Sequence, residues 1–296
     1  MVVNDIRNKR KYFSFDKHIL PWLLIAPALI GVIVIMYYPI FRALYMSFFK
    51  WSIMNPPGDF IGLDNYKLFL TSSFFHEALL NTVIIFVLGM IFGFWVPIIQ
   101  AVCLNEIKKG QAIFRMLYLL PMIVPGVSTI LLWRWIWDPR HGLANEILKI
   151  FGLGPFEWLN TVRLAKIALT FPGILGGGFM VIIYLAAIQG IPKEIYEVAR
   201  IDGANFLQRV FYLTIPNIKN IIYIVFVLSV IGALQYFDWA FIMTAGGPAG
   251  STTTLAIKIY NFAFVSYQFG LASSVGAFIF VLTIILVLIQ FRLKKR

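Results

Sequence analysis

The chain has 296 residues, of which 60% are hydrophobic and only 13% are charged, and this balance excludes an ordinary soluble domain. The formal net charge of +12 at pH 7 could indicate nucleic-acid binding, but the basic residues lie in short clusters beside apolar runs. Such clustering is typical of loops that set the topology of a membrane protein. Cys103 is the single cysteine and the three histidines have no ligand-like spacing, so neither an intrachain disulfide nor a metal site is indicated.

Charge-free stretches predict the membrane-spanning helices. A hydrocarbon layer ~30 Å thick requires about 20 helical residues, and six stretches approach or exceed that length. They are 19–41, 78–105, 116–133, 167–192, 220–237 and 259–291, the last span occupying about 270–291. The sequence therefore predicts an all-α integral membrane protein with six transmembrane helices.

The same pattern divides the chain into four parts. A basic tail (1–18) precedes the first span and its outer loop (19–76), a core of five spans follows (77–291), and a basic tail (292–296) ends the chain. The first apolar run is longer than the core of a signal peptide, so we expect an uncleaved anchor.

Lys and Arg residues predict the orientation. Sixteen of the 25 lie in the two tails and in the 105–115 and 190–219 loops, which all fall on one side of six alternating spans. Cytoplasmic loops carry an excess of these residues, so both termini and the 190–219 loop are expected in the cytoplasm.

The loops on the other side contain shorter elements. Residues Leu63–Phe69 predict a short interfacial segment, and Leu143–Phe151 predict an amphipathic helix ended by Gly152. The run Thr244-Ala245-Gly246-Gly247-Pro248 predicts a tight turn that uses the backbone freedom of glycine.

The longest polar passage between two apolar stretches, residues 190–217, is named here the coupling segment. It predicts a helix starting at Pro192, a break at Asp202-Gly203, a second helical run and a stop at Pro216. Small residues near the break would let another protein approach the backbone closely. The alternative is a helix lying on the bilayer surface, but the acidic residues of its first turns fit an anionic lipid face poorly.

The spacing of this segment resembles a known motif. Glu197-Val198-Ala199, three residues, Gly203, nine residues and then Leu213-Thr214-Ile215-Pro216 resemble the EAA loop of ABC importer permeases. Val198, Leu213 and Ile215 depart mildly from that pattern. The flanking residues and the T-A-G-G-P turn resemble the sugar-permease branch in particular.

The resemblance implies a type I importer permease core whose cytoplasmic coupling helix contacts an ATPase. The residues that would make or shape this contact are Glu197, Ala199, Asp202, Gly203 and Pro216. The implied partners are a second homologous permease, two ATPase subunits that bind ATP and Mg, an extracytoplasmic solute-binding protein and membrane lipid. The resemblance also implies a multi-pass protein of a bacterial or archaeal plasma membrane. The implied solute is a sugar, and among sugars the resemblance favours an oligosaccharide.

The residues give no sign of an enzyme or a cofactor site. The sequence has no phosphate-binding P-loop, no nucleophile elbow and no paired catalytic carboxylates. Polar residues within the predicted spans are few and uncharged, which fits a path for a hydroxyl-rich solute. The candidates for that path are Gln235, Tyr236, Phe237, Asp238 and Trp239. A stand-alone secondary transporter or channel is the alternative, and it would not co-purify with ATPase subunits.

Overall fold

The computed structural model describes residues 20–54, 56–107, 109–120, 123–175 and 178–294. The predicted basic N-terminal tail, Lys108, Lys295 and Arg296 lie outside these residues. Within the described residues every regular element is a helix, accompanied by isolated bridges between Phe49 and Phe60 and between Ser52 and Gln268. The predicted all-α class is confirmed.

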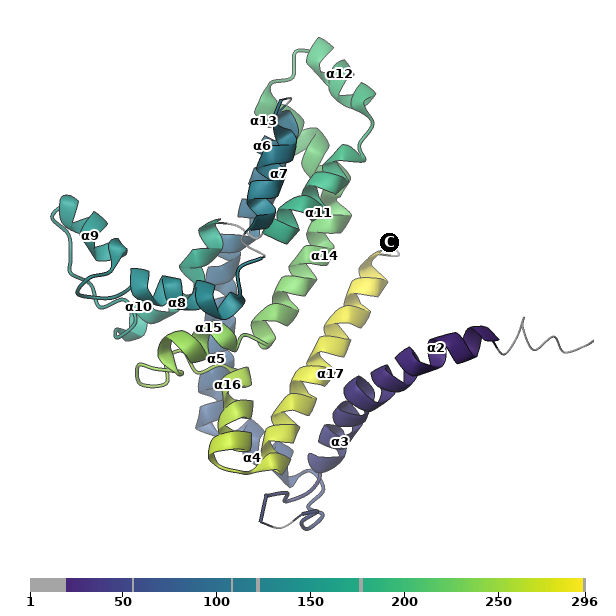
Figure 1. Ribbon diagram of the computed structural model, residues 1–296, viewed down its shortest axis with the longest axis vertical. Coiled ribbons are helices and arrows are strands. Elements are labelled where there is room, and N and C mark those ends of the chain that lie inside the picture. Colours follow the sequence, from purple (N-terminus) through teal and green to yellow (C-terminus); the bar gives the residue numbers. More distant parts are fainter. Residues whose placement is uncertain (1–19, 55, 108, 121–122, 176–177, 295–296) are drawn as a thin grey trace, which may run out of the picture.

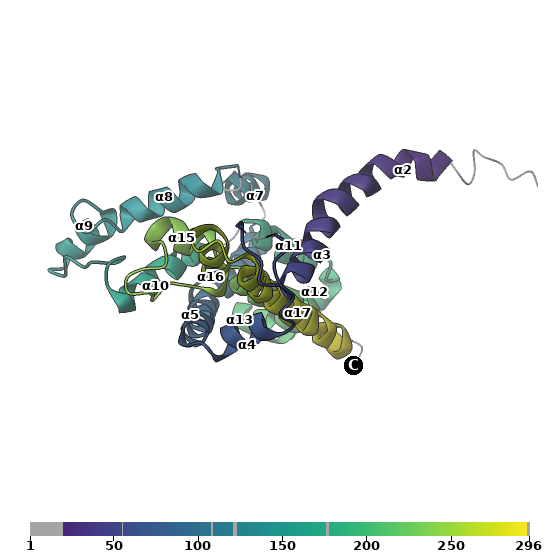
Figure 2. The same cartoon turned by 90° about the horizontal axis from the view of Figure 1, so that it is seen from below.

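The first long helix combines α2 (Leu20–Gly31), a π-helical stretch η1 (Val32–Tyr37) and α3 (Tyr38–Met46). Pro39 follows the π-helical stretch closely, where a wider turn accommodates a residue without a backbone N–H. Figures 1 and 2 show α2 leading away from the other helices while α3 lies beside α17. No residue of α2 is buried, so its apolar surface is free for lipid or another subunit.

The second span is preceded by the short helix α4 (Asp64–Thr71), which confirms the segment predicted around Leu63–Phe69. The span itself joins α5 (Ser73–Gly89), η2 (Met90–Phe94) and α6 (Val96–Glu106) into 34 residues. A π-helical stretch again precedes a proline, Pro97. The span predicted over 78–105 is confirmed.

The region predicted as one span over 116–133 is divided. Helix α7 (Gln111–Leu119) ends before the next helix, α8 (Gly126–Ile136), begins. Pro125 occupies the N-cap of α8 in an extended conformation, and residues preceding a proline disfavour helical geometry. The expectation of a single helix here is wrong, because the non-helical residues 123–125, which end in Pro125, interrupt a stretch that is apolar enough to span.

The next predicted span is also broken. After α9 (Leu143–Ile150) the chain forms α10 (Val162–Thr170), the 3-10 turn η4 (Phe171–Leu175) and α11 (Gly178–Gln189), and the two parts of the span differ in direction by 44°. Gly173 crosses the second span at Gly93, where the Cβ of an alanine at 173 would lie 3.2 Å from the Gly93 Cα. The two glycines therefore permit a close crossing.

The coupling segment forms α12 (Lys193–Ile201), α13 (Phe206–Arg209) and η5 (Val210–Thr214), and it continues into α14 (Ile215–Leu234). Residues Phe206–Leu234 make one helix of 29 residues. The predicted stop at Pro216 is therefore wrong. Pro216 lies in the first turn of α14 directly after the π-helical stretch, where its missing N–H interrupts little.

The chain ends with α15 (Asp238–Thr244), α16 (Leu255–Tyr260), η6 (Asn261–Val265) and α17 (Phe269–Lys294). Helix α17 confirms the last span predicted at about 270–291. The span predicted over 220–237 stops at Leu234, because the chain turns at Gln235 and starts α15 at Asp238.

Four helices in the described residues are long and apolar enough to cross a membrane, and the bent α10–α11 pair makes a fifth. The predicted count of six is not confirmed, since the stretch around α7 and α8 is no single helix. Figure 1 shows α12, α13 and the end of α6 at one end of the molecule, with α4 and the start of α17 at the opposite end.

Candidate functional site

Helix α12 has the local signals of an independent surface helix. Pro192 is its N-cap. Glu194 lies in its first turn and Arg200 in its last turn, where each charge interacts favourably with the helix dipole. At the C-terminus Gly203 adopts φ +80°, and the N–H groups of Gly203 and Ala204 donate to Arg200 O (3.1 Å) and Ala199 O (2.9 Å). This is a Schellman motif, which needs a left-handed residue after the helix. The predicted break at Asp202-Gly203 is confirmed.

The second helix starts with a capping box. Asn205 Oδ1 accepts from the Gln208 N–H (2.9 Å), and Gln208 Oε1 accepts from the Asn205 N–H (2.8 Å). Arg209 adds a hydrogen bond from Nη1 to Ala204 O at 3.0 Å. The turn between α12 and α13 is thus well defined by its own sequence.

The apolar residues of α12 are largely uncovered within the chain. Ile195, Val198 and Ile201 expose 38%, 57% and 84% of their surface, although they lie on the apolar side of an amphipathic helix. Figure 1 shows α12 projecting at the end of the molecule. An amphipathic helix ordinarily buries this side, so α12 has the surface of a helix that docks elsewhere.

The structure places four of the five predicted coupling residues together. Glu197, Asp202 and Gly203 are exposed and Ala199 is half-buried, all in or just after α12. An added Cβ at Gly203 would meet no heavy atom of the described residues within 4 Å. Pro216 is separate, because it belongs to the first turn of α14.

The other side of α12 is attached to the spans. The Tyr196 and Thr214 hydroxyl oxygens lie 2.9 Å apart, and the Tyr196 ring packs against a core cluster formed by α6, α11 and α14. Arg200 Nη2 lies 3.9 Å from Glu106 Oε2 at the end of α6. No local sequence pattern predicts these contacts, because the two hydroxyl groups are 18 residues apart in the chain.

The predicted substrate-path residues lie together at the break between α14 and α15, but their environments differ. The Tyr236 hydroxyl donates to Leu169 O at 2.9 Å, while the Tyr236 carbonyl accepts from Thr254 Oγ1 at 2.7 Å. Phe237 stacks on Phe241, and Trp239 packs with Phe237 and Tyr236 against one cluster of buried hydrophobic residues. These three side chains are used in packing.

Gln235 and Asp238 are exposed instead. Their side-chain polar atoms make no hydrogen bond with any described residue. They are therefore the members of the predicted set that are free to contact a solute.

An aromatic cluster follows directly from this break. It consists of Phe237, Phe241, Tyr260 and Phe264, whose successive ring centroids lie 4.8, 4.6 and 5.3 Å apart. Phe241 also lines a cavity of about 600 Å³, together with Arg134, Asn160 and Thr244. The combination of an aromatic face with amide, hydroxyl and guanidinium groups suits a polar solute that also has apolar ring faces.

Two polar residues in the second span anchor the turn after α15. Asn81 Nδ2 donates to Gly250 O (2.9 Å) and Thr253 O (3.1 Å), and Thr82 Oγ1 accepts from the Leu255 N–H (3.3 Å). Both side chains are buried. They satisfy loop backbone groups rather than line a path. The turn itself has Ala245 and Gly246 at positive φ, which confirms the predicted tight turn.

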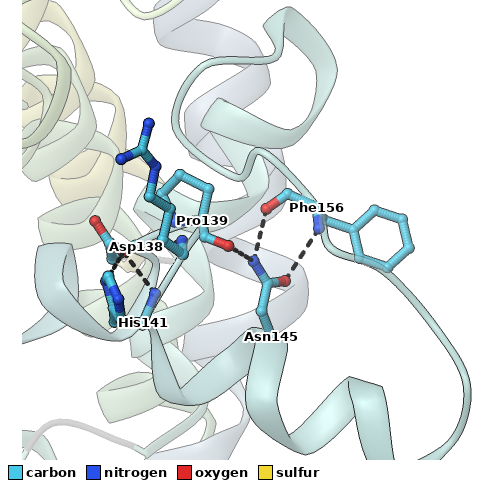
Figure 3. A network of polar contacts seen from close by, with 6 residues as sticks. Asp138, Pro139, His141, Asn145 and Phe156 are labelled. Atoms are coloured by element: carbon cyan, nitrogen blue, oxygen red, sulfur yellow. Dashed lines mark hydrogen bonds and ion pairs between the residues drawn. The ribbon is translucent and has the colours of Figure 1, made fainter.

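The loop from residue 138 to 158 is held by a network of polar contacts (Figure 3). Buried Asn145 donates to Pro139 O (3.1 Å) and Phe156 O (2.9 Å), and its Oδ1 accepts from the Phe156 N–H (3.1 Å). Asp138 Oδ1 accepts from the His141 and Arg140 N–H groups at 2.8 and 2.9 Å, which lowers the pKa of this carboxyl below its ordinary value. Helix α9 and Gly152, at φ +75°, confirm the predicted amphipathic helix and its end.

These features define a class of protein. Apolar helices long enough to span a bilayer carry one projecting polar segment whose apolar side is uncovered, which fits the membrane component of a multi-subunit transporter. Residues 86–296 match the family described as "Binding-protein-dependent transport system inner membrane component", and the chain belongs to this family. The protein is therefore a multi-pass inner-membrane transport component rather than an enzyme.

The sequence similarity to known transport proteins extends over nearly the whole length of the chain. The chain is 32% identical over 282 residues to a probable ABC transporter permease protein of Bacillus subtilis, YurN, covering 94% of this chain and 96% of the relative. It is 30% identical over 289 residues to the trehalose/maltose transport system permease protein MalF of Thermococcus litoralis, covering 97% of each. These relatives confirm the resemblance found in the EAA loop.

A solved structure shows the same fold. A chain of the bacterial alginate ABC transporter, in complex with an alginate pentasaccharide-bound periplasmic protein, matches with a TM-score of 0.82 and 25% identity, covering 95% of this chain and 96% of that chain. The importer-permease fold predicted for the core is confirmed by this match.

Proposed function

We propose that this chain is the permease subunit of an ATP-driven sugar importer and forms half of its translocation pathway. The solute that we propose is an oligosaccharide. One relative is named for trehalose and maltose transport and the solved structure is named for alginate transport, so carbohydrate is the solute class common to these two. The aromatic cluster beside Gln235 and Asp238 supports this class, because sugar rings offer apolar faces as well as hydroxyl groups.

The observation that carries the coupling function is the uncovered apolar side of α12. This chain leaves three apolar side chains exposed on that side, those of Ile195, Val198 and Ile201. At the end of the same helix, the space around Gly203 is open. A cleft on a cytoplasmic ATPase would cover these side chains, with Glu197 and Asp202 making polar contacts at its edge. Two such ATPases would bind the ATP and Mg, one for each of two homologous permeases.

The orientation follows from the same assignment. The coupling segment, the α6–α7 junction and the C-terminus of α17 would face the cytoplasm, together with the N-terminus. The excess of Lys and Arg in these segments supports this. The loop from 138 to 158 and the turn after α15 would then face the extracytoplasmic solute-binding protein. We retain the division into an added first span (19–76) and a permease core (77–291).

The mechanism would be mechanical. Closure of the two ATPases on ATP moves the clefts that hold α12, and the spans shift between inward-open and outward-open arrangements. Residues Phe206–Leu234 form one helix from the coupling turn to the break at Gln235. At ~1.5 Å per residue this helix reaches about 40 Å, so it links the docking surface to the proposed solute path.

Bulk at Gly203 tests the docking assignment. In the complete importer reconstituted in vesicles, we expect Gly203→Trp to abolish solute-dependent coupling, so that ATP hydrolysis no longer drives uptake. The control is Gly203→Ala, which has the same backbone strain at φ +80° but adds little volume. Normal uptake by Gly203→Trp, or equal loss in Gly203→Ala, would contradict docking at this face. Uptake that needs no ATP would contradict the importer itself.

A further inference from the structure

Tyr196 is the residue that connects α12 with the interior of this chain. Of the nine residues of α12, all are exposed except Tyr196 and Ala199, which are half-buried. The Tyr196 ring contacts the core cluster that contains Ile191 and Ile218, and its hydroxyl lies 2.9 Å from Thr214 Oγ1. Ala199 has no side chain long enough to make a comparable contact.

Thr214 lies where the long helix of residues 206–234 changes from a π-helical stretch to a regular α-helix. It is only 3% exposed and is the last residue of the π-helical stretch that precedes Pro216. The Thr214 hydroxyl donates to Arg209 O at 3.3 Å, so its oxygen is left to accept from the Tyr196 hydroxyl. The hydroxyl pair therefore joins α12 to the π-helical stretch rather than to a regular turn.

Among the described residues, the other polar side-chain contact between α12 and the spans is weaker. Arg200 and Glu106 are 3.9 Å apart, and their side chains are 52% and 41% exposed. Exposed ion pairs of this kind contribute on average about 0–1 kcal/mol. The Tyr196–Thr214 hydrogen bond is partly buried and joins one side chain to the 3%-exposed Thr214, so water competes with it less than with the exposed ion pair. Of the two attachments, the hydroxyl pair is the one that can fix the position of α12.

We propose that Tyr196 and Thr214 are positioning residues that transmit the movement of α12 to α14, and through α14 to the solute path at Gln235. This inference rests on the proposed function of the coupling segment. If the hydroxyl pair is lost, α12 can still dock on the ATPase and ATP can still be hydrolysed. Helix α14 then moves less when α12 moves, so fewer solute molecules are transported per ATP.

The test uses the complete importer, with its ATPases and solute-binding protein, in sealed vesicles. We measure the ratio of solute imported to ATP hydrolysed for Tyr196→Phe and Thr214→Val, which remove one hydroxyl each and keep the size of the side chain. We expect the ratio to fall by about two- to tenfold, the range that corresponds to the loss of one hydrogen bond. The double variant should be no worse than either single variant, because both remove the same bond.

Two control variants separate the hydroxyl pair from general effects. Thr214→Ser keeps the hydroxyl and should restore the ratio that Thr214→Val loses. Tyr212→Phe makes the same chemical change within the π-helical stretch, but Tyr212 is 77% exposed, and we expect a normal ratio. A loss in Tyr212→Phe equal to that in Tyr196→Phe would overturn the inference.

The outcomes also distinguish this inference from the proposed function. If Tyr196→Phe and Thr214→Val keep a normal ratio while Gly203→Trp is uncoupled, docking stands and the positioning role is wrong. If the variants lower only the yield or thermal stability of the complex, and the assembled fraction transports normally per ATP, the pair is structural and the inference is overturned. Normal coupling in Gly203→Trp would instead remove the basis of the docking assignment.

Discussion

Gln235 and Asp238 illustrate how the structure sorts residues that look equivalent in the sequence. All five residues from Gln235 to Trp239 were candidates for the solute path. Tyr236 satisfies Leu169 O, and Phe237 and Trp239 contribute to packing, whereas Gln235 and Asp238 leave their polar groups exposed. Among these five residues, the polar contacts with the solute are therefore expected from Gln235 and Asp238.

Replacing these two side chains tests that assignment. We expect Gln235→Ala and Asp238→Ala to reduce the rate of uptake at low solute concentration by roughly three- to tenfold, because each loses about one hydrogen bond to the solute. ATP hydrolysis in the presence of the solute-binding protein should persist. Tyr236→Phe serves as the comparison, since its hydroxyl bonds within the chain and its loss should lower stability more than uptake. Unchanged uptake in both alanine variants would exclude them as contacts.

At the scale of elements, prolines shape the long helices without ending them. Pro39, Pro97 and Pro216 each follow a π-helical stretch, and each lies in the first turn of the next helical part. In the wider π-helical turn, the carbonyl groups do not follow the regular α-helical hydrogen-bond pattern. The absence of a proline N–H therefore costs little, and the helix continues through the proline. Pro125 differs, because it caps a new helix after α7 has ended.

Pro216 provides a quantitative test of this interpretation. Pro216→Ala should change the free energy of unfolding of the purified complex by less than about 1 kcal/mol, because the π-helical stretch already accommodates the proline. Ile222→Pro, in the interior of α14, should cost about 3 kcal/mol or more, because it removes a regular hydrogen bond and clashes with the preceding turn. Thermal unfolding of both variants measures the difference. A gain of several kcal/mol in Pro216→Ala would mean that the proline interrupts the helix after all.

For the whole molecule, the arrangement of the ends matters most. The coupling segment lies at the end opposite α4 and the start of α17 (Figure 1), and the long helix of residues 206–234 runs between the coupling turn and the proposed path. Under the proposed coupling, the force and the solute would act on different ends of the same helices. Helix α12 would then face the compartment that contains ATP.

Labelling of single thiols tests this orientation. Cys103 is exposed and is first replaced by Ser, so that each introduced thiol is the single one in the chain. A membrane-impermeant reagent added to intact cells should label Lys149→Cys in α9 but not Asp202→Cys after α12. After the cells are opened, Asp202→Cys should react as well. Labelling of Asp202→Cys from outside would reverse the topology and refute the coupling function.

The sequence by itself determined the features that are local along the chain. Apolar length indicated membrane spans, Gly203 and Asp202 indicated the end of α12, and the spacing from Glu197 to Pro216 identified the family. These features depend on propensities, turn geometry and hydrophobicity, which residues express largely through their near neighbours.

The tertiary structure decided what depends on contacts between distant residues. It showed that Pro216 continues a helix, that 116–133 is divided, that Asn81 supports a loop 169 residues away, and that Tyr196 meets Thr214. A hydrogen bond between two surfaces depends on how whole helices pack, and a proline stops or bends a helix according to the turn that precedes it. Neither is encoded in a local pattern, so the attachment of α12 to α14 became visible only in three dimensions.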